Sequence, residues 1–383
     1  MKAPKYRSFF YTMNLSYWEI KSWLTHVDYT IVGSGIVGLN CALQLKKRFP
    51  KSNILILEKG MLPQGASTKN AGFACFGSLS EIIDDLKHHS EDEVIELIKK
   101  RVNGLKLLRE TLGDTTIDYQ NLGGYELFLE SDEVLYDTCL KNQGNINTLL
   151  KPIFKDEVFS LKENRFDFKT IKPKYSFNQF EGQIDTGKMM EALLSKAQQE
   201  GIKILNNCTV KHFEDNVNGV KIETNNFEFS TKNVLIATNG FAITLIEQPV
   251  KPARAQVLIT KPIKDLHIKG TFHLDEGYYY FRNINNRILF GGGRNLDFKT
   301  EETSEFGETE IIQNKLAALL KTAILPNTDF EIDHSWSGIM GVGQQKKAIV
   351  KQLSNHVYCG VRLGGMGIAI GSLVGKELAD LLD

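Results

Sequence analysis

The chain lacks most of the features that mark secreted, membrane-spanning and metal-binding proteins. Its five cysteines are scattered over 383 residues with no CxxC pair, and its eight histidines show no metal-ligand spacing. We therefore predict free thiols in a reducing compartment and no bound metal. No apolar run is long enough to span a membrane, and residues 1–27 lack the apolar core and cleavage site of a signal peptide. These absences predict a cytoplasmic protein with no membrane span.

A surplus of charge of one sign is also absent. Lysine and arginine total 46, and aspartate and glutamate also total 46, so the chain has no strongly basic surface for nucleic acid. We expect a small molecule as the partner and no nucleic acid. The length exceeds that of one small core, which predicts two domains or one large elaborated domain. The composition sets no oligomeric state.

The most informative stretch runs from Asp28 to Glu58. It opens with an apolar run at 29–32 that fits a strand buried on both faces, and then breaks into the glycine turn Gly33-Ser34-Gly35-Ile36-Val37-Gly38. A helix should follow, with cations at 46–48 in its last turn. A second apolar run at 54–57 ends in Glu58. The order of strand, glycine turn, helix, strand and acid predicts a dinucleotide site.

Each part of this stretch has a physical role toward a dinucleotide. Gly33 makes the tight turn, Gly35 lets the backbone approach a pyrophosphate, and Gly38 lets the helix pack closely on the strand. The free amide hydrogens and the positive dipole end of the helix favour an anion. Glu58 lies twenty residues after Gly38, where a carboxylate accepts hydrogen bonds from a ribose hydroxyl and repels the extra phosphate of NADP.

The first half of the chain predicts an extension, a ligand-wrapping segment and helices. Residues 1–27 are expected to pack over the first domain. Residues 60–80 are rich in small side chains and are placed to wrap a ligand. Residues 80–113 have the spacing of amphipathic helices, and their charges, Arg101 among them, are expected on a solvated face. A strand is expected at 125–130, followed by a poorly periodic region up to residue 180.

The second half predicts further helices, two groups of strands and a second glycine turn. Residues 185–201 should form a capped helix, and residues 307–323 an amphipathic one. The strands are expected at 202–205, 209–213, 217–223, 227–230 and 234–237, and then, as an antiparallel group, at 255–260, 278–282 and 287–290. A strand at 357–359 leads into the glycine turn 360–367. The closing helix at 368–382 therefore offers a second anion site.

This arrangement resembles the FAD-dependent amino acid and amine oxidoreductases of the D-amino acid oxidase family, which include glycine oxidase, sarcosine oxidase and γ-glutamylputrescine oxidase. The segments that carry the resemblance are Gly33 to Gly38 with Glu58, Ala66 to Phe73, Val234 to Gly240, Tyr279 to Arg282, Trp336 to Gly338 and Gly364 to Ile368. They span nearly the whole chain. The resemblance implies an α/β fold, with a Rossmann-like FAD-binding domain and a discontinuous substrate domain built on a mixed or antiparallel sheet.

The resemblance also implies domain limits and cofactor contacts. The N-terminal extension takes residues 1–26, the FAD-binding domain 27–80, 181–245 and 330–383, and the substrate domain 81–180 and 246–329. The residues that would contact FAD are Gly33, Gly35, Ile36, Val37, Gly38, Glu58, Lys59, Ala66, Ser67, Thr68, Asn70, Ala71, Gly72, Phe73, Val210, Ala237, Thr238, Gly240, Gly364, Gly365, Met366, Gly367 and Ile368. The last helix would then point its positive end at the pyrimidine end of the flavin, where reduction leaves negative charge.

The implied reaction is oxidation of a C–N bond in a small amine or amino acid. A hydride passes from the carbon that bears the neutral amine to the flavin, and water hydrolyses the imine that results. The electron acceptor that reoxidises the flavin is oxygen or another carrier. No catalytic side chain is assigned, because the protein's task is to position the substrate and to set the electrostatics of the flavin.

Tyr280 and Arg282 share one face of the strand expected at 278–282, and one departure from the family pattern bears on the other substrate contacts. Glycine oxidase and its relatives carry Trp-x-Gly-Leu-Arg-Pro, with the arginine on the substrate carboxylate, where this chain has Trp336-Ser337-Gly338-Ile339-Met340-Gly341. A methionine cannot pair with a carboxylate. Either Arg282, Lys69 or Arg254 replaces the arginine, or the substrate lacks a carboxylate next to its amine. The candidate substrate contacts are Tyr280, Arg282, Met340, Lys69 and Trp336, with a structural ion pair as the alternative for Arg282.

Other functions stay open at this point. An NAD-dependent dehydrogenase would use the first glycine turn but needs no second one near residue 364. A pyridine nucleotide–disulfide reductase would show a second GxGxxG and a cysteine pair, and neither is present. A D-amino acid or glycine oxidase or dehydrogenase requires a substitute carboxylate anchor. A flavin-binding protein without turnover would hold FAD and never be reduced by an amine.

Overall fold

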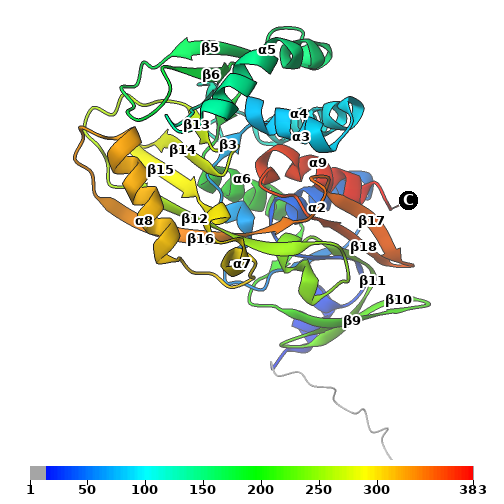
Figure 1. Ribbon diagram of the computed structural model, residues 1–383. Helices are drawn as coiled ribbons and strands as arrows, with labels where there is room; N and C mark the ends of the chain where they lie inside the picture. The colour runs from blue at the N-terminus through cyan, green and yellow to red at the C-terminus, as the bar shows by residue number, and fades with distance from the viewer. Residues whose placement is uncertain (1–13, 383) are drawn as a thin grey trace, which may run out of the picture.

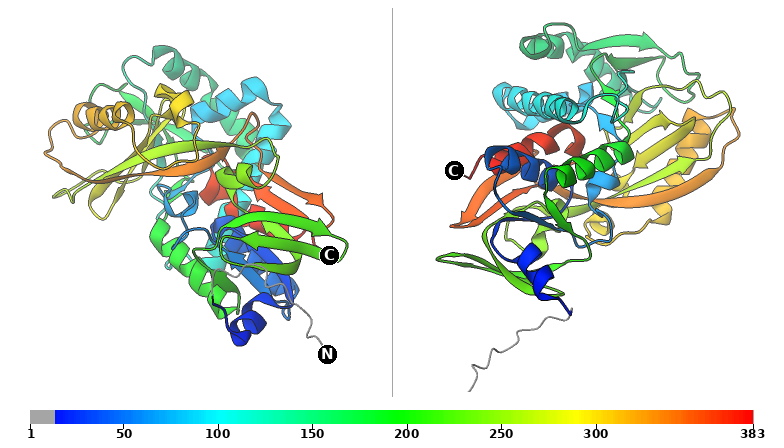
Figure 2. Two further views of the ribbon diagram at one scale, coloured as in Figure 1. Left: turned by 90° about the horizontal axis from the view of Figure 1, so that it is seen from below. Right: turned by 180° about the vertical axis from the view of Figure 1, so that it is seen from behind.

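The stretch from Asp28 to Glu58 forms the centre of a parallel sheet. The computed structural model of the protein describes residues 14–382, and Figures 1 and 2 show its arrangement. Strand β1 (Val27–Val32), helix α2 (Ile36–Arg48) and strand β2 (Ile54–Leu57) follow one another as predicted. β1 and β2 pair in parallel, and every residue of β2 is buried, as expected for a strand covered on both faces.

The first sheet collects strands from distant parts of the chain. Its order is β17 (Ile349–Ser354), β18 (Val357–Val361), β11 (Glu228–Ile236), β1, β2 and β8 (Lys203–Leu205), and β10 (Gly219–Thr224) and β9 (Val210–Asn216) extend it from β11. β18, β11, β1, β2 and β8 run parallel. The strands predicted at 227–230 and 234–237 are the single strand β11, because Thr231 between them points inward and keeps the alternation.

Helices cover one face of this sheet and a β-ribbon covers the other. α2, α6 (Thr186–Gln199) and α9 (Gly367–Ala379) lie side by side in Figure 2 and form one apolar core with β1 and β2. α9 approaches α2 closely at Gly375, where an added Cβ would lie only 2.7 Å from the carbonyl oxygen of Val37. The β9–β10 ribbon and η3 (Asn239–Thr244) enclose the core on the opposite face.

The N-terminal extension is described from residue 14 onward. It contains α1 (Tyr17–Glu19) and η1 (Ile20–Leu24). Leu24 joins the core beside β1, whereas Trp18 is exposed. Residues 1–13, which belong to the predicted extension, lie outside the described residues.

The second sheet is built mainly from the middle of the chain. Its order is β16 (Ile332–Val342), β12 (Lys251–Thr260), β15 (Arg287–Gly292), β14 (Tyr279–Ile284), β13 (Thr271–Leu274), β4 (Gly124–Glu126), β6 (Lys174–Asn178) and β5 (Phe159–Glu163). Phe272, Phe281 and Phe290 lie in register on one face. α8 (Glu310–Leu319) covers that face, on the outer side of the molecule in Figure 1. The opposite face is free to meet the first sheet.

Three longer helices and several short elements complete the described chain. The longer helices are α3 (Leu79–His88), α4 (Glu91–Leu112) and α5 (Glu133–Phe154). Ser78 and Ser90 begin α3 and α4 with capping boxes. The short elements are η2 (Ala66–Thr68), β3 (Phe73–Ala74), β7 (Gly182–Gln183), η4 (Arg294–Leu296), α7 (Phe298–Glu301) and η5 (Leu320–Ile324).

The predicted fold class is confirmed, since a parallel sheet with flanking helices is joined to a second, mixed sheet. The domain limits stay a prediction. β16 pairs with β12 in the second sheet, although the predicted limits group residues 330–383 with the FAD-binding domain. The chain crosses between the two sheets after β16, because the neighbouring strands β17 and β18 belong to the first sheet.

Three further observations concern the sequence-based exclusions. Within residues 14–382, no helix is long and apolar enough to cross a membrane. The same residues contain no group of three or more histidine, cysteine or acidic side chains that could hold a metal ion. All five cysteines are buried free thiols.

Candidate functional site

A cavity of about 1150 Å³ lies where the free face of the second sheet meets the strand ends of the first. Its wall includes the β1–α2 turn, the segment 64–73, the end of β11 and the start of α9. The second sheet contributes side chains from β12, β14 and β16. The cavity therefore joins every segment that carries the family resemblance.

The glycine turn between β1 and α2 is tightly packed within itself, and the segment that follows β2 is hydrogen-bonded to it. A Cβ at Gly38 would lie 2.0 Å from the carbonyl oxygen of Gly33, so only glycine lets α2 pack this closely on β1. The backbone N–H of Ile36, in the first turn of α2, donates to Ser67 Oγ at 2.9 Å. The segment that follows β2 is thus fixed against the start of α2, and both line the cavity.

Glu58 is held in one orientation beside this turn. Its carboxylate is buried, with 6% of the residue exposed. Oε2 accepts hydrogen bonds from the backbone N–H of Ser34 at 3.0 Å and from the Ser34 hydroxyl at 2.7 Å, and Oε1 accepts one from the N–H of Gly60 at 3.0 Å. These three bonds leave acceptor capacity for a ribose hydroxyl at the cavity wall.

Further features of the wall fit a dinucleotide. The hydroxyl of Thr238, at the end of β11, is buried without a hydrogen-bond partner in the described chain and lines the cavity. A phosphate oxygen would satisfy it. At the start of α9, Cβ atoms on Gly365 and Gly367 would meet nothing within 4 Å. This leaves the positive end of the helix open to an anion.

Most of the predicted cofactor contacts line this cavity. They are Gly33, Gly35, Ile36, Val37, Glu58, Lys59, Ala66, Ser67, Asn70, Ala71, Gly72, Phe73, Val210, Ala237, Thr238, Gly364, Gly365, Met366, Gly367 and Ile368. Three do not line it. Gly38 packs inside the turn, the Thr68 hydroxyl donates to Pro63 O, and Gly240 packs against the carbonyl of Met340. The cofactor roles of all these residues stay predictions, and each of these three has a structural reason for its place.

Tyr280 lies flat over the second sheet inside the cavity. A Cβ at Gly291, its neighbour on β15, would lie 2.7 Å from the tyrosine ring, so the glycine makes room for it. The Phe73 ring packs edge-on against Tyr280, with centroids 5.6 Å apart. Burial raises the pKa of Tyr280 to about 12, which keeps its hydroxyl protonated. Tyr280 is therefore a neutral hydrogen-bonding group on the cavity wall.

Lys69 meets Trp336 at strand β16, the edge strand of the second sheet, which also carries Met340. Trp336 does not line the cavity, but its Nε1–H donates to the carbonyl oxygen of Lys69 at 2.9 Å. A Cβ at Gly338 would lie 2.8 Å from Lys69 Cβ. Lys69 and Met340 both line the cavity, and within residues 14–382 no carboxylate lies within 4.0 Å of the Lys69 ammonium. Trp336 thus positions Lys69 from outside the cavity.

Two of the proposed substitute anchors lie outside the cavity. Arg254 donates from Nε and Nη2 to the Glu301 carboxylate, each at 2.8 Å, and this buried pair occupies the guanidinium. Arg282 is 2% exposed and does not line the cavity. Burial lowers its pKa to about 10, against the opposing charge of Asp185. No ion pair of Arg282 is found among the described residues, so the structural alternative predicted for it is not observed.

His273 is a cavity residue that the sequence did not indicate. It sits beside Tyr280 on β13, and its Nε2 lies 2.5 Å from Glu181 Oε1. Burial alone would lower the pKa of His273, but the charge and hydrogen bond of Glu181, with smaller effects from Glu81 and Glu126, raise it to about 9. At neutral pH the imidazole is therefore a buried cation with a carboxylate partner.

The sequence did not indicate several other residues that line the cavity. Glu81 and Asp84 of α3 and Glu276 of the β13–β14 turn form an acidic side of the cavity. Burial raises the pKa of Glu276, and the charge of Asp84 raises it further. Arg101 was expected on a solvated face, and this prediction is wrong, because α4 turns its side chain inward to the cavity. The signal was available, since Arg101 continues the apolar row of Ile98.

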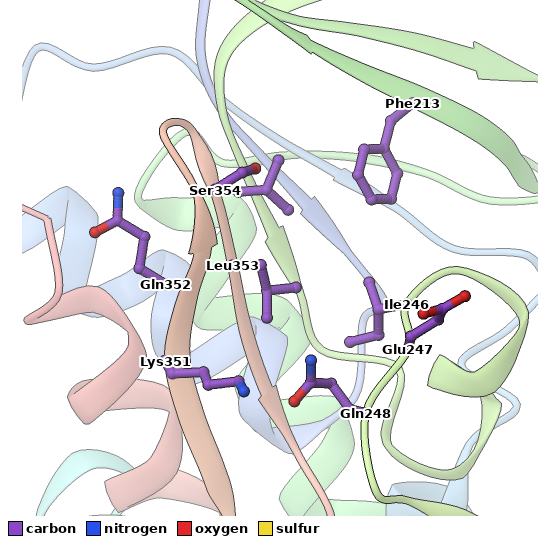
Figure 3. A pocket seen from close by; sticks show the side chains of 9 residues that line it. Phe213, Ile246, Glu247, Gln248, Lys351, Gln352, Leu353 and Ser354 are labelled. Atoms are coloured by element: carbon purple, nitrogen blue, oxygen red, sulfur yellow. The ribbon is translucent and has the colours of Figure 1, made fainter.

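A second, smaller hollow lies away from these residues. Figure 3 shows it between the β17–β18 hairpin, strand β9 and the loop after η3. Its volume is about 290 Å³. Its lining includes Phe213, Gln248, Lys351 and Leu353. None of the predicted site residues lines it, so the predicted site lies in the larger cavity.

Comparisons with known proteins agree with this geometry. The family profile described as "DAO: FAD dependent oxidoreductase" matches residues 28–381. The Haemophilus influenzae protein named "Probable oxidoreductase OrdL" is 20% identical over 375 residues, which cover 94% of this chain and 83% of that protein.

Solved structures share the fold over nearly the whole chain. Glycine oxidase from Geobacillus kaustophilus has a TM-score of 0.75 at 20% identity, covering 93% of this chain and 95% of that one. L-proline dehydrogenase from P. horikoshii has a TM-score of 0.69 at 18% identity, covering 93% and 92%. The two-sheet architecture around the cavity is therefore common to these proteins.

Proposed function

We propose that this chain, which belongs to the family of FAD-dependent oxidoreductases, oxidises the C–N bond of a small amine. The proposed amine has no carboxylate next to its nitrogen. The chemistry that FAD supplies when bound is uptake of the hydride that leaves the substrate carbon. Water then hydrolyses the imine. The cavity residues have to hold the amine, favour its neutral form at the reacting carbon and exclude competing water.

The observation that carries this proposal is Met340. It lines the cavity on β16, at the point where the related pattern has its carboxylate-binding arginine. Arg254 is occupied by Glu301, and Arg282 lies outside the cavity. Two of the three predicted substitutes are therefore poorly placed to hold a substrate carboxylate, which favours a substrate that has none.

The acidic side of the cavity supports the same substrate class. Glu81, Asp84 and Glu276 line it, and carboxylates attract an ammonium group and repel a carboxylate. Burial is the largest cause of the raised pKa of Glu276, and the charge of Asp84 raises it further, whereas Lys87 and the cavity residue Lys346 oppose this effect. A second ammonium group on the substrate would offset the repulsion between Asp84 and Glu276, which favours a diamine over a monoamine.

The cofactor would be held by the glycine turn, by Glu58 and by the start of α9. In this placement the helix α2 faces the pyrophosphate, and Glu58 receives the ribose hydroxyl. Thr238 would donate its free hydroxyl to a phosphate oxygen. Tyr280 and Phe73 would then enclose the space over which the amine reacts.

One observation favours a second candidate, oxidation of an amino acid. Lys69 lines the cavity and has no carboxylate within 4.0 Å among the described residues, so it is available to pair with a substrate carboxylate. Glycine oxidase and L-proline dehydrogenase, two of the similar structures, are named for amino acid substrates. In this case Lys69 takes the role of the missing arginine.

Matched substrate pairs separate the two candidates. The purified holoprotein is mixed anaerobically with putrescine or ornithine, and with cadaverine or lysine, and bleaching of the flavin absorbance is recorded. The members of each pair differ only in the α-carboxylate. Faster bleaching by the diamines supports the first proposal, and bleaching by the amino acids alone contradicts it. Readmission of air then shows whether oxygen reoxidises the flavin.

Two variants sharpen this experiment. Met340→Arg restores the cation of the related pattern and should shift the preference toward ornithine and lysine by about 10- to 100-fold, since a charge-assisted pair contributes about 1.5–3 kcal/mol. Lys69→Met should leave diamine oxidation intact if the first proposal holds. Loss of amino acid oxidation in Lys69→Met would instead identify the lysine as the carboxylate anchor. A holoprotein bleached by none of a wide panel of amines and amino acids would be a flavin-binding protein without turnover.

A further inference from the structure

Arg101 is a buried cation with no anion beside it. The residue is 4% exposed on α4 and lines the cavity. Nη1 donates to the carbonyl oxygen of Phe76 at 2.7 Å, whereas Nε is buried without a partner. Within residues 14–382 no carboxylate lies within 4.0 Å of the guanidinium. Because burial of an unpaired charge is strongly unfavourable, we expect a negative group beside Arg101 when the cavity is filled.

The other two arginines of the cavity are in different situations. Arg362 donates three hydrogen bonds, from Nε and Nη2 to Lys347 O and from Nη1 to Pro249 O. Arg294 is only half-buried and packs over the Phe298 ring, 4.8 Å from its centroid. Neither arginine therefore combines deep burial with a single hydrogen bond. Arg101 does, and its one bond goes to a neutral carbonyl.

Arg101 lies at the end of the cavity where α9 begins. Gly104, one turn further along α4, faces α9 so closely that a Cβ would lie 2.2 Å from Ala369 O. Cys75, which precedes the residue that Arg101 holds, has its Sγ 3.9 Å from Met366 Sδ. The guanidinium and the positive end of α9 thus approach the same part of the cavity and favour an anion together.

The charges of the cavity indicate which part of the cofactor lies there. Glu58 and the start of α2 take the ribose and the pyrophosphate, so the flavin ring has to extend from α2 toward α9. Uptake of a hydride brings two electrons and one proton to the ring, and the added electron pair leaves it negative until a second proton arrives. A fixed cation that does not give up its proton stabilises this reduced form.

We propose that Arg101 is a positioning residue for the cofactor, whose guanidinium holds the negative charge of the reduced flavin ring. The proposal rests on FAD binding and on no particular amine. Its failure and the failure of the proposed substrate class are therefore distinguishable, because the flavin can be reduced without any substrate.

The test is the two-electron reduction potential of the bound flavin, measured against a reference dye without substrate. Arg101→Gln removes the charge and keeps a donor for Phe76 O, and Arg101→Lys keeps the charge. We expect Arg101→Gln to shift the reduction equilibrium about tenfold toward the oxidised form, about 30 mV, and Arg101→Lys to shift it less. Lys100→Met is the matched control. It removes a cation of the same helix that pairs with Glu377 at 2.7 Å outside the cavity, and it should leave the potential unchanged.

A second measurement covers variants that bind FAD weakly. Apoprotein is titrated with oxidised and with reduced FAD, and the ratio of the two dissociation constants reports the same charge effect. Arg101→Gln should lose about ten times more affinity for reduced FAD than for oxidised FAD. Equal losses for both forms, or an equal shift in Arg101→Lys and Arg101→Gln, would overturn the proposal.

Binding of acetate to the oxidised holoprotein, followed by the flavin spectrum, tests the rival anion. If Arg101→Gln weakens acetate binding about tenfold and leaves the potential unchanged, the cofactor role is overturned. Arg101 would then be the anchor of a substrate carboxylate.

Discussion

Replacement of Glu58 by glutamine tests the geometry of the glycine turn most directly. Its two carboxylate oxygens accept three hydrogen bonds, two from Ser34 and one from Gly60. An amide has a single acceptor oxygen, so Glu58→Gln turns its NH₂ group toward a donor in either orientation. The less costly orientation keeps the Ser34 bonds and loses the Gly60 bond. Loss of one charge-assisted bond and weakening of two others should cost about 2–4 kcal/mol.

The assay is thermal unfolding of the apoprotein, followed by circular dichroism. An unfolding entropy of about 2.1 cal/mol/K per residue gives about 0.8 kcal/mol/K for a chain of this length, so the midpoint should fall by about 2–5 °C. Glu96→Gln makes the same change at an exposed position of α4 and should stay within about 0.5 kcal/mol of the parent. The unfolding midpoint should fall further in the holoprotein of Glu58→Gln than in its apoprotein, because the bond to the ribose is also weakened.

Two results would refute this reasoning. A midpoint of the Glu58→Gln apoprotein equal to that of Glu96→Gln would mean that the three observed bonds do not stabilise the turn. An unchanged affinity for FAD, measured by titration of the apoprotein, would mean that Glu58 does not contact the cofactor.

Three further predictions concern other parts of the site. The Glu181 carboxylate raises the pKa of His273 from 6.5 to about 9 although burial opposes it, so the pair stabilises the fold fully below pH 6.5 and this contribution is lost as the pH rises through 9. Chemical denaturation across that range should show a fall in the free energy of unfolding that His273→Gln flattens. Gly38→Ala would put a Cβ 2.0 Å from a backbone oxygen and, by overpacking worth about 1–3 kcal/mol, should weaken FAD binding about tenfold in a flavin titration. Gly291→Ala should tilt the Tyr280 ring and raise the KM for the amine several-fold, and a parallel loss of bound flavin would contradict this.

The dinucleotide stretch could be predicted because its local and tertiary requirements agree. The turn needs glycine at Gly38 for a packing reason that involves only its neighbours in sequence. The strands on either side are buried on both faces, so their apolar runs are unambiguous. The closing helix is also predicted to within a few residues, at 368–382, and it spans Gly367–Ala379 in the structure.

Other helices and strands could not be predicted, because their sequence signals are weak. α5 occupies part of the region that shows no clear period, and Gly144 and Pro152 interrupt its apolar spacing. β16 contains Gly338 and Gly341, which disfavour a strand locally, yet it pairs with β12 along its length. In both cases contacts with distant residues decide the structure.

The charged site residues were harder to predict than the glycines. Arg101 follows two lysines in the sequence, and a run of charges on an amphipathic helix is ordinarily solvated. His273 and Glu181 are 92 residues apart, and nothing local to either indicates their pairing. Residues whose role depends on a partner far along the chain become visible only when the sheets are assembled.

The first sheet takes its strands from both ends of the chain, and this affects the order in which the site is completed during synthesis. A growing chain that has emerged as far as β11 already contains the glycine turn, Glu58 and most of the parallel strands. It still lacks β18, which pairs with β11 in the first sheet, and the start of α9, which lines the cavity. The flavin end of the site therefore cannot be completed before residue 379 has left the ribosome. We therefore expect the cofactor to be captured only after α9 has been synthesised, and a chain truncated before α9 should be released without it.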